Sequence, residues 1–214
     1  MIKACIFDLD GVLVDTAKYH FLAWKRLAAE LGFELTEEVN EKLKGVSRMQ
    51  SLEIILSLSG ISLSQEEKEK LADRKNSWFT EFVANMEADE IFPGVKPLLQ
   101  KLKEDTIKIA LASSSKNAQS VIDLLGIKNN FDAVVDGNMI THTKPDPEIF
   151  LLAAGKLNIQ PQDCLVFEDA EAGVEAALRA GMKCVGIGSR SQLPQATLVI
   201  NAVQDFDYST LQSL

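Results

Sequence analysis

Five short stretches of the chain are apolar at almost every position, without the alternation of apolar and polar residues that a half-exposed strand shows. They cover residues 2–7, 107–112, 133–135, 164–167 and 183–187. Continuous apolar runs of this length are typical of parallel strands whose two faces are both covered by helices. The pattern therefore predicts five buried strands in a parallel sheet.

Helical segments with recognisable ends separate the later runs. Ser115 is a candidate N-cap for a helix over residues 117–125, since a serine hydroxyl can accept a hydrogen bond from the first turn. Asp146 is the equivalent candidate for the next helix, and a third helix is expected over residues 170–180. This alternation predicts a doubly wound, Rossmann-like α/β sheet, whose ligand site lies beyond the carboxyl ends of the strands.

One long segment breaks this rhythm. Between Asp15 and Phe92 the pattern contains no convincing strand, and apolar residues recur at the spacing of an amphipathic helix. The clearest face is formed by Ala17, Phe21, Trp24, Leu27 and Leu31. We therefore predict two domains, an α/β catalytic core over residues 1–14 and 93–214 and an inserted helical cap over residues 15–92.

The overall composition limits the classes of partner. The 214-residue chain is 46% hydrophobic and 25% charged, which is typical of a globular protein and excludes a disordered or fibrous one. Its formal net charge of −9 disfavours nucleic acid, because nucleic-acid recognition depends on basic patches. Phosphate groups can still be ligands where a metal ion and local cations gather in one cleft.

The cellular location can also be inferred from the sequence. The three cysteines lie in or next to apolar runs, so we expect buried, reduced thiols and a reducing compartment. No signal peptide fits the start of the chain, and no stretch approaches the ~20 apolar residues that span a bilayer. We therefore expect a soluble, cytoplasmic protein without a membrane partner, and we expect a monomer.

The strongest chemical signal directly follows the first predicted strand. Asp8 and Asp10 are two residues apart, at the strand end where the ligand crevice of the sheet is expected. One carboxylate there can attack phosphorus while a second, protonated one acts as a general acid. Gly11 permits the tight turn that brings both toward one substrate. On its own, this pair is equally well explained as a turn with two solvated acids.

Three further strand or loop ends carry complementary chemistry. Ser113 follows the second strand just before a helix, where hydroxyl and backbone N–H donors suit a phosphate. Lys144 precedes the next helix and could neutralise a phosphoryl group, while Glu168 and Asp169 could hold a hard cation such as Mg²⁺. Each feature alone is more often a helix cap, a solvated lysine or a pair of solvated acids. Together they predict a phosphoryl-transfer site.

These motifs resemble those of the haloacid-dehalogenase superfamily. The matching residues are Asp8-Leu9-Asp10-Gly11, Ser113, Lys144 and Glu168-Asp169. The resemblance spans essentially the whole chain, including the helical segment after the first strand. Within the predicted cap, residues 15–21, 23–25, 43–48 and 74–76 look most like the β-phosphoglucomutase branch of the superfamily.

The resemblance implies a role for each motif residue. Asp8 would be the nucleophile that becomes an aspartyl phosphate, and Asp10 would be the general acid and base. Ser113 and Lys144 would hold the transferring phosphate. The Mg²⁺ site would be formed by Asp8, Asp169, the backbone carbonyl of Asp10 and the nearby Glu168.

The resemblance also implies how the substrate is held. Arg48 would grip the phosphate that is not transferred, helped by Ser115 and Asn117 of the core, since a guanidinium can bind phosphate through two parallel hydrogen bonds. The sugar pocket would be shaped by His20, Trp24, Lys44, Gly45, Val46, Ser47 and Lys75. Without the family, His20 is equally well explained as a structural histidine, Arg48 as a surface arginine and Trp24 as a core residue. His142 is expected to be a loop residue without an assigned role.

The implied activity is that of a Mg²⁺-dependent phosphomutase acting on small sugar phosphates. It would interconvert β-D-glucose 1-phosphate and glucose 6-phosphate through β-glucose 1,6-bisphosphate and an aspartyl-phosphate enzyme. A sugar-phosphate or phosphoglycolate-type phosphatase is the nearest alternative, because its chemistry differs only in the use of water. Asp10 and Glu168-Asp169 argue against a dehalogenase, and the long cap segment argues against a receiver-type signalling module.

Overall fold

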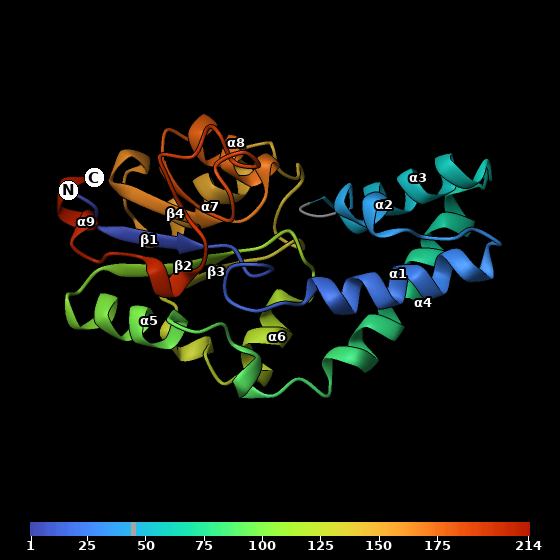
Figure 1. Ribbon diagram of the computed structural model, residues 1–214, viewed down its shortest axis with the longest axis horizontal. Helices are drawn as coiled ribbons and strands as arrows, with labels where there is room; N and C mark the ends of the chain where they lie inside the picture. Colours follow the sequence, from blue (N-terminus) through green and yellow to red (C-terminus); the bar gives the residue numbers. More distant parts are fainter. Residues whose placement is uncertain (44–45) are drawn as a thin grey trace. The chain divides into compact units, whose positions relative to one another are not determined.

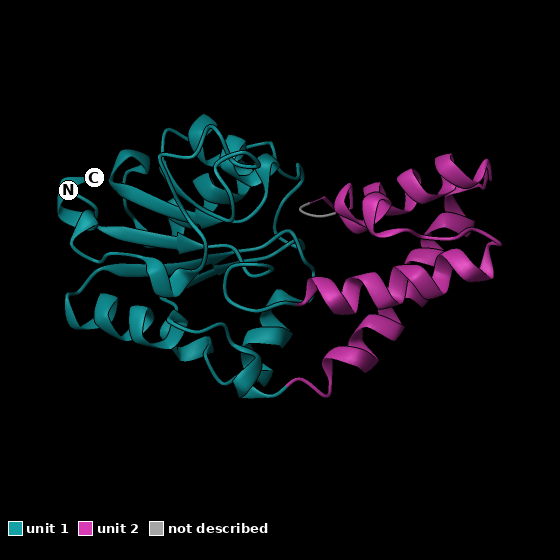
Figure 2. Ribbon diagram, in the orientation of Figure 1, with its two compact units in different colours: residues 1–15, 87–214 teal, residues 16–86 magenta. Residues whose placement is uncertain are grey.

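The computed structural model describes residues 1–43 and 46–214 of the chain. These residues form two compact units (Figure 2). The first unit contains residues 1–15 and 87–214, and the second contains residues 16–86. The second unit is thus inserted into the sequence of the first, directly after the opening strand and turn.

The sequence predicted that the cap ends at Phe92, but the second unit ends at Met86. The residues just before Phe92 attach to the first unit instead. Ile91 bridges Val14, and the Phe92 N–H donates a hydrogen bond to the Leu13 carbonyl oxygen at 2.9 Å. Because of these backbone bonds, Ile91 and Phe92 belong to the first unit, which resumes at Glu87.

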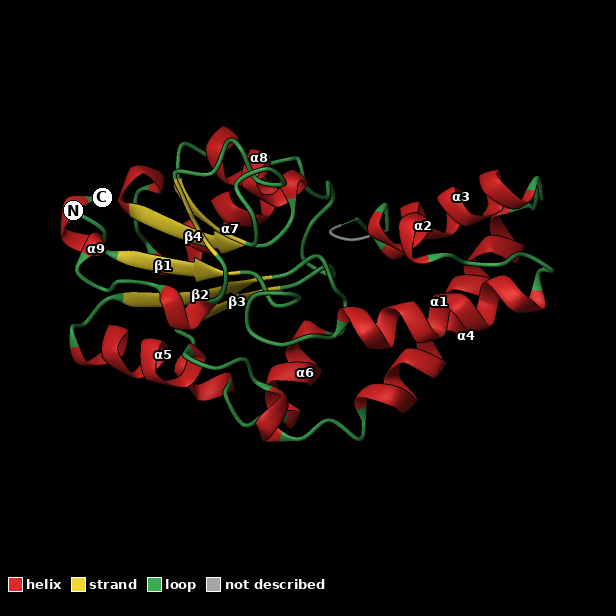
Figure 3. Ribbon diagram, viewed as in Figure 1, coloured by secondary structure: helices red, strands yellow, loops and turns green. Residues whose placement is uncertain are grey.

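The first unit is built on a parallel sheet (Figures 1 and 3). Its strands are β1 (Ala4–Phe7), β2 (Lys108–Ala112), β3 (Ala133–Val135), β4 (Cys164–Glu168), β5 (Lys183–Ile187) and β6 (Leu198–Ile200). Across the sheet their order is β3-β2-β1-β4-β5-β6. The predicted doubly wound α/β architecture is confirmed, and the described residues add one strand, β6, to the five that the sequence predicted.

Helices connect the strands and cover both faces of the sheet. They are α5 (Val95–Glu104), α6 (Ala118–Leu124), α7 (Glu148–Leu157), α8 (Glu171–Arg179) and the short α9 (Thr210–Ser213). Single 3₁₀ turns occur at Ala88–Glu90, Lys128–Asn130, Pro161–Asp163 and Val203–Asp205. Figure 1 shows α7 and α8 on one face of the sheet and α5 on the other, and each of these helices packs on the strands. This is the layered arrangement expected of alternating strands and helices.

The residues of β1, β2, β4 and β5 are buried almost throughout, on both faces of the sheet, which explains why these runs do not alternate. The face toward α7 and α8 carries small residues such as Ala4, Ala110 and Cys164. The opposite face carries Phe7 and Phe167, whose rings stack with their centroids 4.6 Å apart. Small side chains let the helices approach closely on one face, and the aromatic pair fills the space on the other.

β1 and β4 are neighbouring parallel strands, and the later strands of the sheet are added on opposite sides of this pair. From β1 the order continues outward to β2 and β3, and from β4 it continues to β5 and β6. Such a reversal is a topological switch point, where the loops diverge and leave room for a ligand. The register pairs Phe7 with Phe167, so Asp8 and Glu168 leave neighbouring strands at the same level.

Two predicted helix starts differ in detail from the observed ones. The N-cap position of α6 is Asn117, while Ser115 lies further upstream and its Oγ accepts a hydrogen bond from the Asn117 N–H at 3.2 Å. The N-cap position of α7 is Pro147, while Asp146 Oδ1 accepts from the Glu148 N–H at 2.9 Å. Both predicted side chains therefore bond to the backbone at a helix start, but each helix begins later than predicted.

The second unit is built from α-helices in its described residues. They are α1 (Ala17–Glu30), α2 (Glu37–Glu41), α3 (Arg48–Ser59) and α4 (Gln65–Val83), and α4 packs against both α1 and α3. Ser47 and Ser64 each form a capping box with the residue three positions later, which fixes where α3 and α4 begin. Among the described residues, no helix of either unit has both the length and the apolar character needed to span a membrane.

Candidate active site

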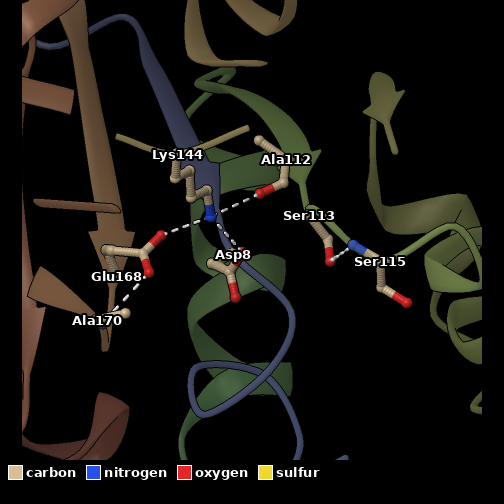
Figure 4. A network of polar contacts seen from close by, with 7 residues as sticks. All are labelled: Asp8, Ala112, Ser113, Ser115, Lys144, Glu168 and Ala170. Carbon is tan, nitrogen blue, oxygen red and sulfur yellow. Dashed lines mark hydrogen bonds and ion pairs between the residues drawn. The ribbon is translucent and has the colours of Figure 1, made fainter. Parts of the chain in front are cut away.

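A buried cluster of charged side chains lies at the carboxyl ends of β1 and β4 (Figure 4). The Lys144 ammonium group donates hydrogen bonds to Asp8 Oδ1 at 2.6 Å and to Glu168 Oε2 at 2.8 Å. It also donates to the Ala112 carbonyl oxygen at 3.4 Å. The side chains of Lys144 and Glu168 are each 1% exposed, and that of Asp8 is 8% exposed. One cation is thus held between two anions that water barely reaches.

The charges in this cluster depend on one another. Burial acts to lower the pKa of Lys144, but the charges of Asp8 and Glu168 outweigh burial and raise this pKa above its ordinary value. Burial raises the pKa of Glu168, and the charges of Asp8 and Asp169 act in the same direction against the Lys144 ammonium. Lys144 therefore stays positively charged and Glu168 holds a proton more readily than an exposed glutamate, while the charges of Asp8 and Asp169 outnumber that of Lys144.

The same carboxyl groups can hold a metal ion. Ligand oxygens of Asp8, Glu168 and Asp169 all lie within 4.8 Å of one another. Carboxylate oxygens are the ligands that hard divalent cations prefer. One such cation would also balance the negative charge that Lys144 leaves uncompensated. The donor set therefore fits a divalent metal.

Two glycines make room for these carboxylates. Gly11 has a φ of 75°, a conformation that favours glycine, and a Cβ at this position would overlap the Asp169 carboxylate. A Cβ at Gly173 would overlap the side chain of Glu168. The sequence predicted Gly11 from the tight turn alone, and the structure adds that this glycine also leaves space for Asp169.

We expect Gly11→Ala to weaken divalent-metal binding and to displace Asp169, because the new methyl group would occupy the position of the carboxylate. Gly32→Ala is a matched control: Gly32 has a similar φ of 74°, but nothing lies within 4 Å of its added Cβ. Both variants carry the backbone strain of a left-handed alanine, about 1–2 kcal/mol. Calorimetric titration with Mg²⁺ measures the difference. Equal metal affinity in the two variants would show that Gly11 acts through the backbone alone.

The backbone around Asp10 is fixed by a tight turn after β1. Asp10 bridges Val14, and the Gly11 N–H donates to the Val14 carbonyl oxygen at 2.9 Å. The Leu13 N–H donates to the Leu9 carbonyl oxygen, also at 2.9 Å. Asp10 is only partly buried, in contrast to the buried Asp8. The two motif carboxylates therefore occupy different environments although they are two residues apart.

The groups predicted to bind phosphate gather in the loop between β2 and α6. Ser113 is 1% exposed, and its Oγ accepts a hydrogen bond from the Ser115 N–H at 3.2 Å. Ser115 Oγ in turn accepts from the Asn117 N–H. Because Ser113 follows Ala112, whose carbonyl bonds to Lys144, this loop lies beside the charged cluster (Figure 4). Hydroxyl and backbone donors thus collect next to Asp8.

The structure brings together three of the residues predicted to shape the sugar pocket, all within the second unit. Lys75 Nζ lies 2.7 Å from His20 Nδ1 and 4.5 Å from the centroid of the Trp24 ring. The His20 ring also stacks on Phe79, with the ring centroids 4.0 Å apart. Lys75 and Trp24 are 1% and 3% exposed. These side chains form a buried polar and aromatic cluster between α1 and α4.

The ionisation of this cluster follows from its surroundings. Burial lowers the pKa of His20 well below its usual range, and the positive charges of Lys75 and Arg48 lower it further. A neutral imidazole can accept a hydrogen bond through Nδ1 when its proton is on Nε2. We infer that the Lys75 ammonium donates to His20 Nδ1, which fixes this tautomer.

Arg48 is the first residue of α3 and follows the N-cap residue Ser47. Its guanidinium lies 3.7 Å from the Asp73 carboxylate, and its side chain keeps 20% of its surface exposed. Burial lowers the pKa of Arg48, and the charge of Asp73 opposes this shift. Val46 precedes this start of α3, whereas the predicted residues Lys44 and Gly45 lie outside the described residues.

Two backbone groups at the site were not found from the sequence. The Ala112 carbonyl accepts a hydrogen bond from Lys144, and the Ala170 N–H donates to Glu168 Oε1 at 3.2 Å. Every residue carries these groups, so no residue type marks them. The apolar runs did predict the ends of β2 and β4, and these strand ends are the only sequence signal for the position of the two backbone groups.

Comparisons with known proteins identify the family of this chain. A family model described as a haloacid dehalogenase-like hydrolase matches residues 2–181. The chain belongs to this family. The resemblance predicted from the four motifs is therefore confirmed, and the family relationship implies an enzyme with a divalent metal.

Individual relatives are similar over nearly the whole chain. The chain is 44% identical to a β-phosphoglucomutase of Bacillus subtilis (strain 168), over 98% of this chain and 93% of the relative. It is 36% identical to a phosphorylated carbohydrates phosphatase of Thermotoga maritima, over 85% of this chain and 82% of the relative. A crystal structure of β-phosphoglucomutase from Clostridium difficile matches with a TM-score of 0.97 and 42% identity, over 100% of this chain and 96% of that one.

Proposed function

We propose that the protein is a β-phosphoglucomutase that interconverts β-D-glucose 1-phosphate and glucose 6-phosphate through β-glucose 1,6-bisphosphate. The observation that carries this proposal is the 44% identity to the Bacillus subtilis β-phosphoglucomutase, because it extends over both units of the chain. The buried cluster of Asp8, Lys144 and Glu168 supports the same chemistry, since a carboxylate lies next to a fixed positive charge and to acids that could bind a metal.

Asp8 is the nucleophile in this proposal, and it forms the aspartyl phosphate. Its carboxylate accepts a hydrogen bond from the Lys144 ammonium, which fixes the position of the oxygen atoms that attack phosphorus. Asp10 gives a proton to the departing sugar oxygen and takes one from the incoming hydroxyl. The more exposed position of Asp10 suits a group that must exchange protons with the substrate.

The transferring phosphoryl group is positioned by donors from two loops. Lys144 balances its charge, and the Ser113 hydroxyl and neighbouring backbone N–H groups bind its oxygens. Mg²⁺ is the proposed metal, bound by Asp8, Asp169, the backbone carbonyl of Asp10 and the nearby Glu168. When bound, it supplies positive charge that lowers the repulsion between the carboxylates and the phosphate.

The helical unit supplies further substrate-binding residues in this proposal. Arg48 binds the phosphate that is not transferred, and Ser115 and Asn117 are the further phosphate-binding residues proposed for the first unit. His20, Trp24, Lys75 and the segment from Lys44 to Ser47 shape the sugar pocket. A cap of this kind excludes water, so that a sugar hydroxyl and not water accepts the phosphoryl group.

A sugar-phosphate phosphatase is the second candidate function. The 36% identity to the phosphorylated carbohydrates phosphatase of Thermotoga maritima favours it, because that relative also spans most of the chain. The two functions share every step up to the aspartyl phosphate and differ in the molecule that accepts the phosphoryl group. The higher identity and the fuller coverage of the β-phosphoglucomutase relative favour the mutase.

Phosphorus NMR distinguishes the two functions directly. The protein is incubated with Mg²⁺, β-glucose 1-phosphate and a trace of β-glucose 1,6-bisphosphate. Glucose 6-phosphate is the product expected of the mutase, and removal of the metal with a chelator should stop its formation. Accumulation of inorganic phosphate without glucose 6-phosphate would establish the phosphatase instead.

Arg48→Ala is expected to lower kcat/KM for β-glucose 1-phosphate about 10–100-fold, the effect of losing a hydrogen bond to a charged group worth about 1.5–3 kcal/mol. Phosphorylation of Asp8 by acetyl phosphate should change far less, because this donor has no second phosphate. Arg74→Ala is the matched control, since Arg74 is another arginine of the helical unit and pairs with Glu30 at 2.8 Å. Equal losses with both substrates would assign Arg48 a structural role.

A further inference from the structure

A second group of metal-binding side chains lies outside the carboxylate cluster of the active site. His142, Asp146 and Glu148 each offer a ligand atom, and these atoms all lie within 4.8 Å of one another. The sequence assigned no role to His142. We propose that these three residues bind a transition-metal ion such as Zn²⁺, at a site separate from that of the catalytic metal.

The distance within the group fits two ligands of one metal. His142 Nδ1 lies 3.1 Å from Glu148 Oε2. Ligands at about 2.0–2.2 Å from a zinc ion lie roughly 3–3.5 Å apart when the angle between them is octahedral or tetrahedral. An ion can therefore take the place of the direct contact between imidazole and carboxylate with little movement of either side chain.

The carboxylates are held in place before any ion binds. Glu148 Oε1 accepts a hydrogen bond from the Thr141 N–H at 2.9 Å, and Glu148 Oε2 accepts from the His142 N–H at 2.6 Å. Asp146 Oδ1 accepts from the Glu148 N–H at 2.9 Å. Secondary hydrogen bonds of this kind orient metal ligands and raise affinity. Each carboxylate oxygen has further lone pairs available for a cation.

The donor set selects a different class of ion from the active site. An imidazole nitrogen with two carboxylates suits borderline transition metals such as Zn²⁺, Co²⁺ or Ni²⁺, whereas Mg²⁺ prefers oxygen ligands only. The His142 side chain is 68% exposed and that of Glu148 is 30% exposed, so water can reach the group and complete the coordination.

The other cysteine and histidine side chains of the chain are less accessible than His142. The three cysteines are free but buried. His20, the other of the two histidines, stacks on Phe79 and bonds through Nδ1 to Lys75. His142 is therefore the imidazole that an added transition metal meets.

The three proposed ligands lie in or directly after the loop that carries Lys144, so metal binding should affect the stability of this loop. His142 and Glu148 flank Lys144, whose ammonium contacts Asp8 and Glu168. An ion bound at both flanks ties the two ends of this loop together. Metal binding should therefore raise the melting temperature of the protein through the loop that carries the central cation of the active site.

Histidine NMR tests the proposal, because the chain has two histidines. The imidazole C–H resonances are followed during a Zn²⁺ titration with Mg²⁺ in excess, which keeps the carboxylate cluster of the active site filled. We expect the His142 resonances to shift and those of His20 to stay unchanged. Zn²⁺ should also raise the melting temperature of the wild type and not that of His142→Asn.

Asp146→Asn separates a built site from a lone surface histidine. This change keeps the Oδ1 acceptor for the Glu148 N–H but removes the charge, so the loop should keep its fold. We expect it to weaken Zn²⁺ binding at His142 by at least about ten-fold, because even the loss of a group that only orients a metal ligand costs about 10–100-fold in affinity. Asp123→Asn, a change to an exposed acid of α6, should have no effect. Unshifted His142 resonances at millimolar Zn²⁺, or unchanged affinity in Asp146→Asn, would overturn the proposal.

Discussion

Asp8→Asn is expected to abolish the phosphoenzyme completely, whereas Asp10→Asn should leave the metal site intact and still collapse sugar turnover. An amide at position 8 is no nucleophile toward phosphorus, and it also removes one anionic ligand from the cluster with Glu168 and Asp169. An amide at position 10 keeps the backbone carbonyl but cannot transfer a proton. General acid–base catalysis is typically worth about 10²–10⁴-fold, so a loss of at least this size is expected for Asp10→Asn.

Steady-state mutase rates and Mg²⁺ affinity, measured on both variants, test this division of labour. Incubation with acetyl phosphate followed by hydroxylamine detects an aspartyl phosphate independently of sugar turnover. A hydroxylamine-labile phosphoenzyme in Asp8→Asn would assign the nucleophile to another residue. Near-normal turnover in Asp10→Asn would remove this residue from acid–base catalysis.

The sheet could be predicted from the sequence where strands are buried on both faces. β1, β2, β4 and β5 are almost entirely buried, so their apolar runs stand out from the helices around them. β6 is an edge strand of three partly buried residues, Leu198–Ile200. Such a short run beside a loop carries no periodicity, and its place in the sheet follows from pairing with β5. This strand was therefore not predicted from the sequence.

The first-unit residues of the site were predictable for the same reason. Asp8, Ser113 and Glu168 follow or end predicted strands, and parallel strands bring their carboxyl ends to one edge of the sheet. Lys144 lies in a loop, where a lysine is usually solvated. Lys144 is buried between two carboxylates because β1, β2 and β4 lie side by side, and this pairing could not be inferred from the loop sequence.

The helical unit was harder to predict because its polar cluster depends on how the helices pack. A lysine is almost never fully buried unless it is paired, so its residue type alone did not indicate that Lys75 lies in the interior. The structure packs α1 against α4, which puts the Lys75 ammonium over the Trp24 ring and next to His20. Trp24 was correctly considered as a core residue on its helical spacing, since that spacing is a local property of one helix.

The second large effect is expected from Lys144→Met. Methionine fills much of the space of lysine but leaves Asp8 and Glu168 facing each other without the ammonium between them. Removing one partner of a buried ion pair typically costs about 3–5 kcal/mol, because the remaining charges are neither solvated nor paired. We therefore expect a loss of this size in the free energy of unfolding, together with loss of mutase activity. Unfolding is measured by urea titration in the presence of a chelator, so that no divalent cation replaces the ammonium.

Two further variants make the Lys144 result specific. Lys108→Met removes an exposed lysine that pairs with Asp132 at 2.9 Å, and a pair at the surface is worth only about 0–1 kcal/mol. The double variant Lys144→Met/Glu168→Gln removes one of the two uncompensated carboxylates, so it should recover part of the lost free energy of unfolding. It should not recover activity, because the phosphoryl group still lacks the charge of Lys144. If the double variant is as unstable as Lys144→Met, the loss comes from packing of the lysine side chain, and the ion cluster does not account for the stability of this edge of the sheet.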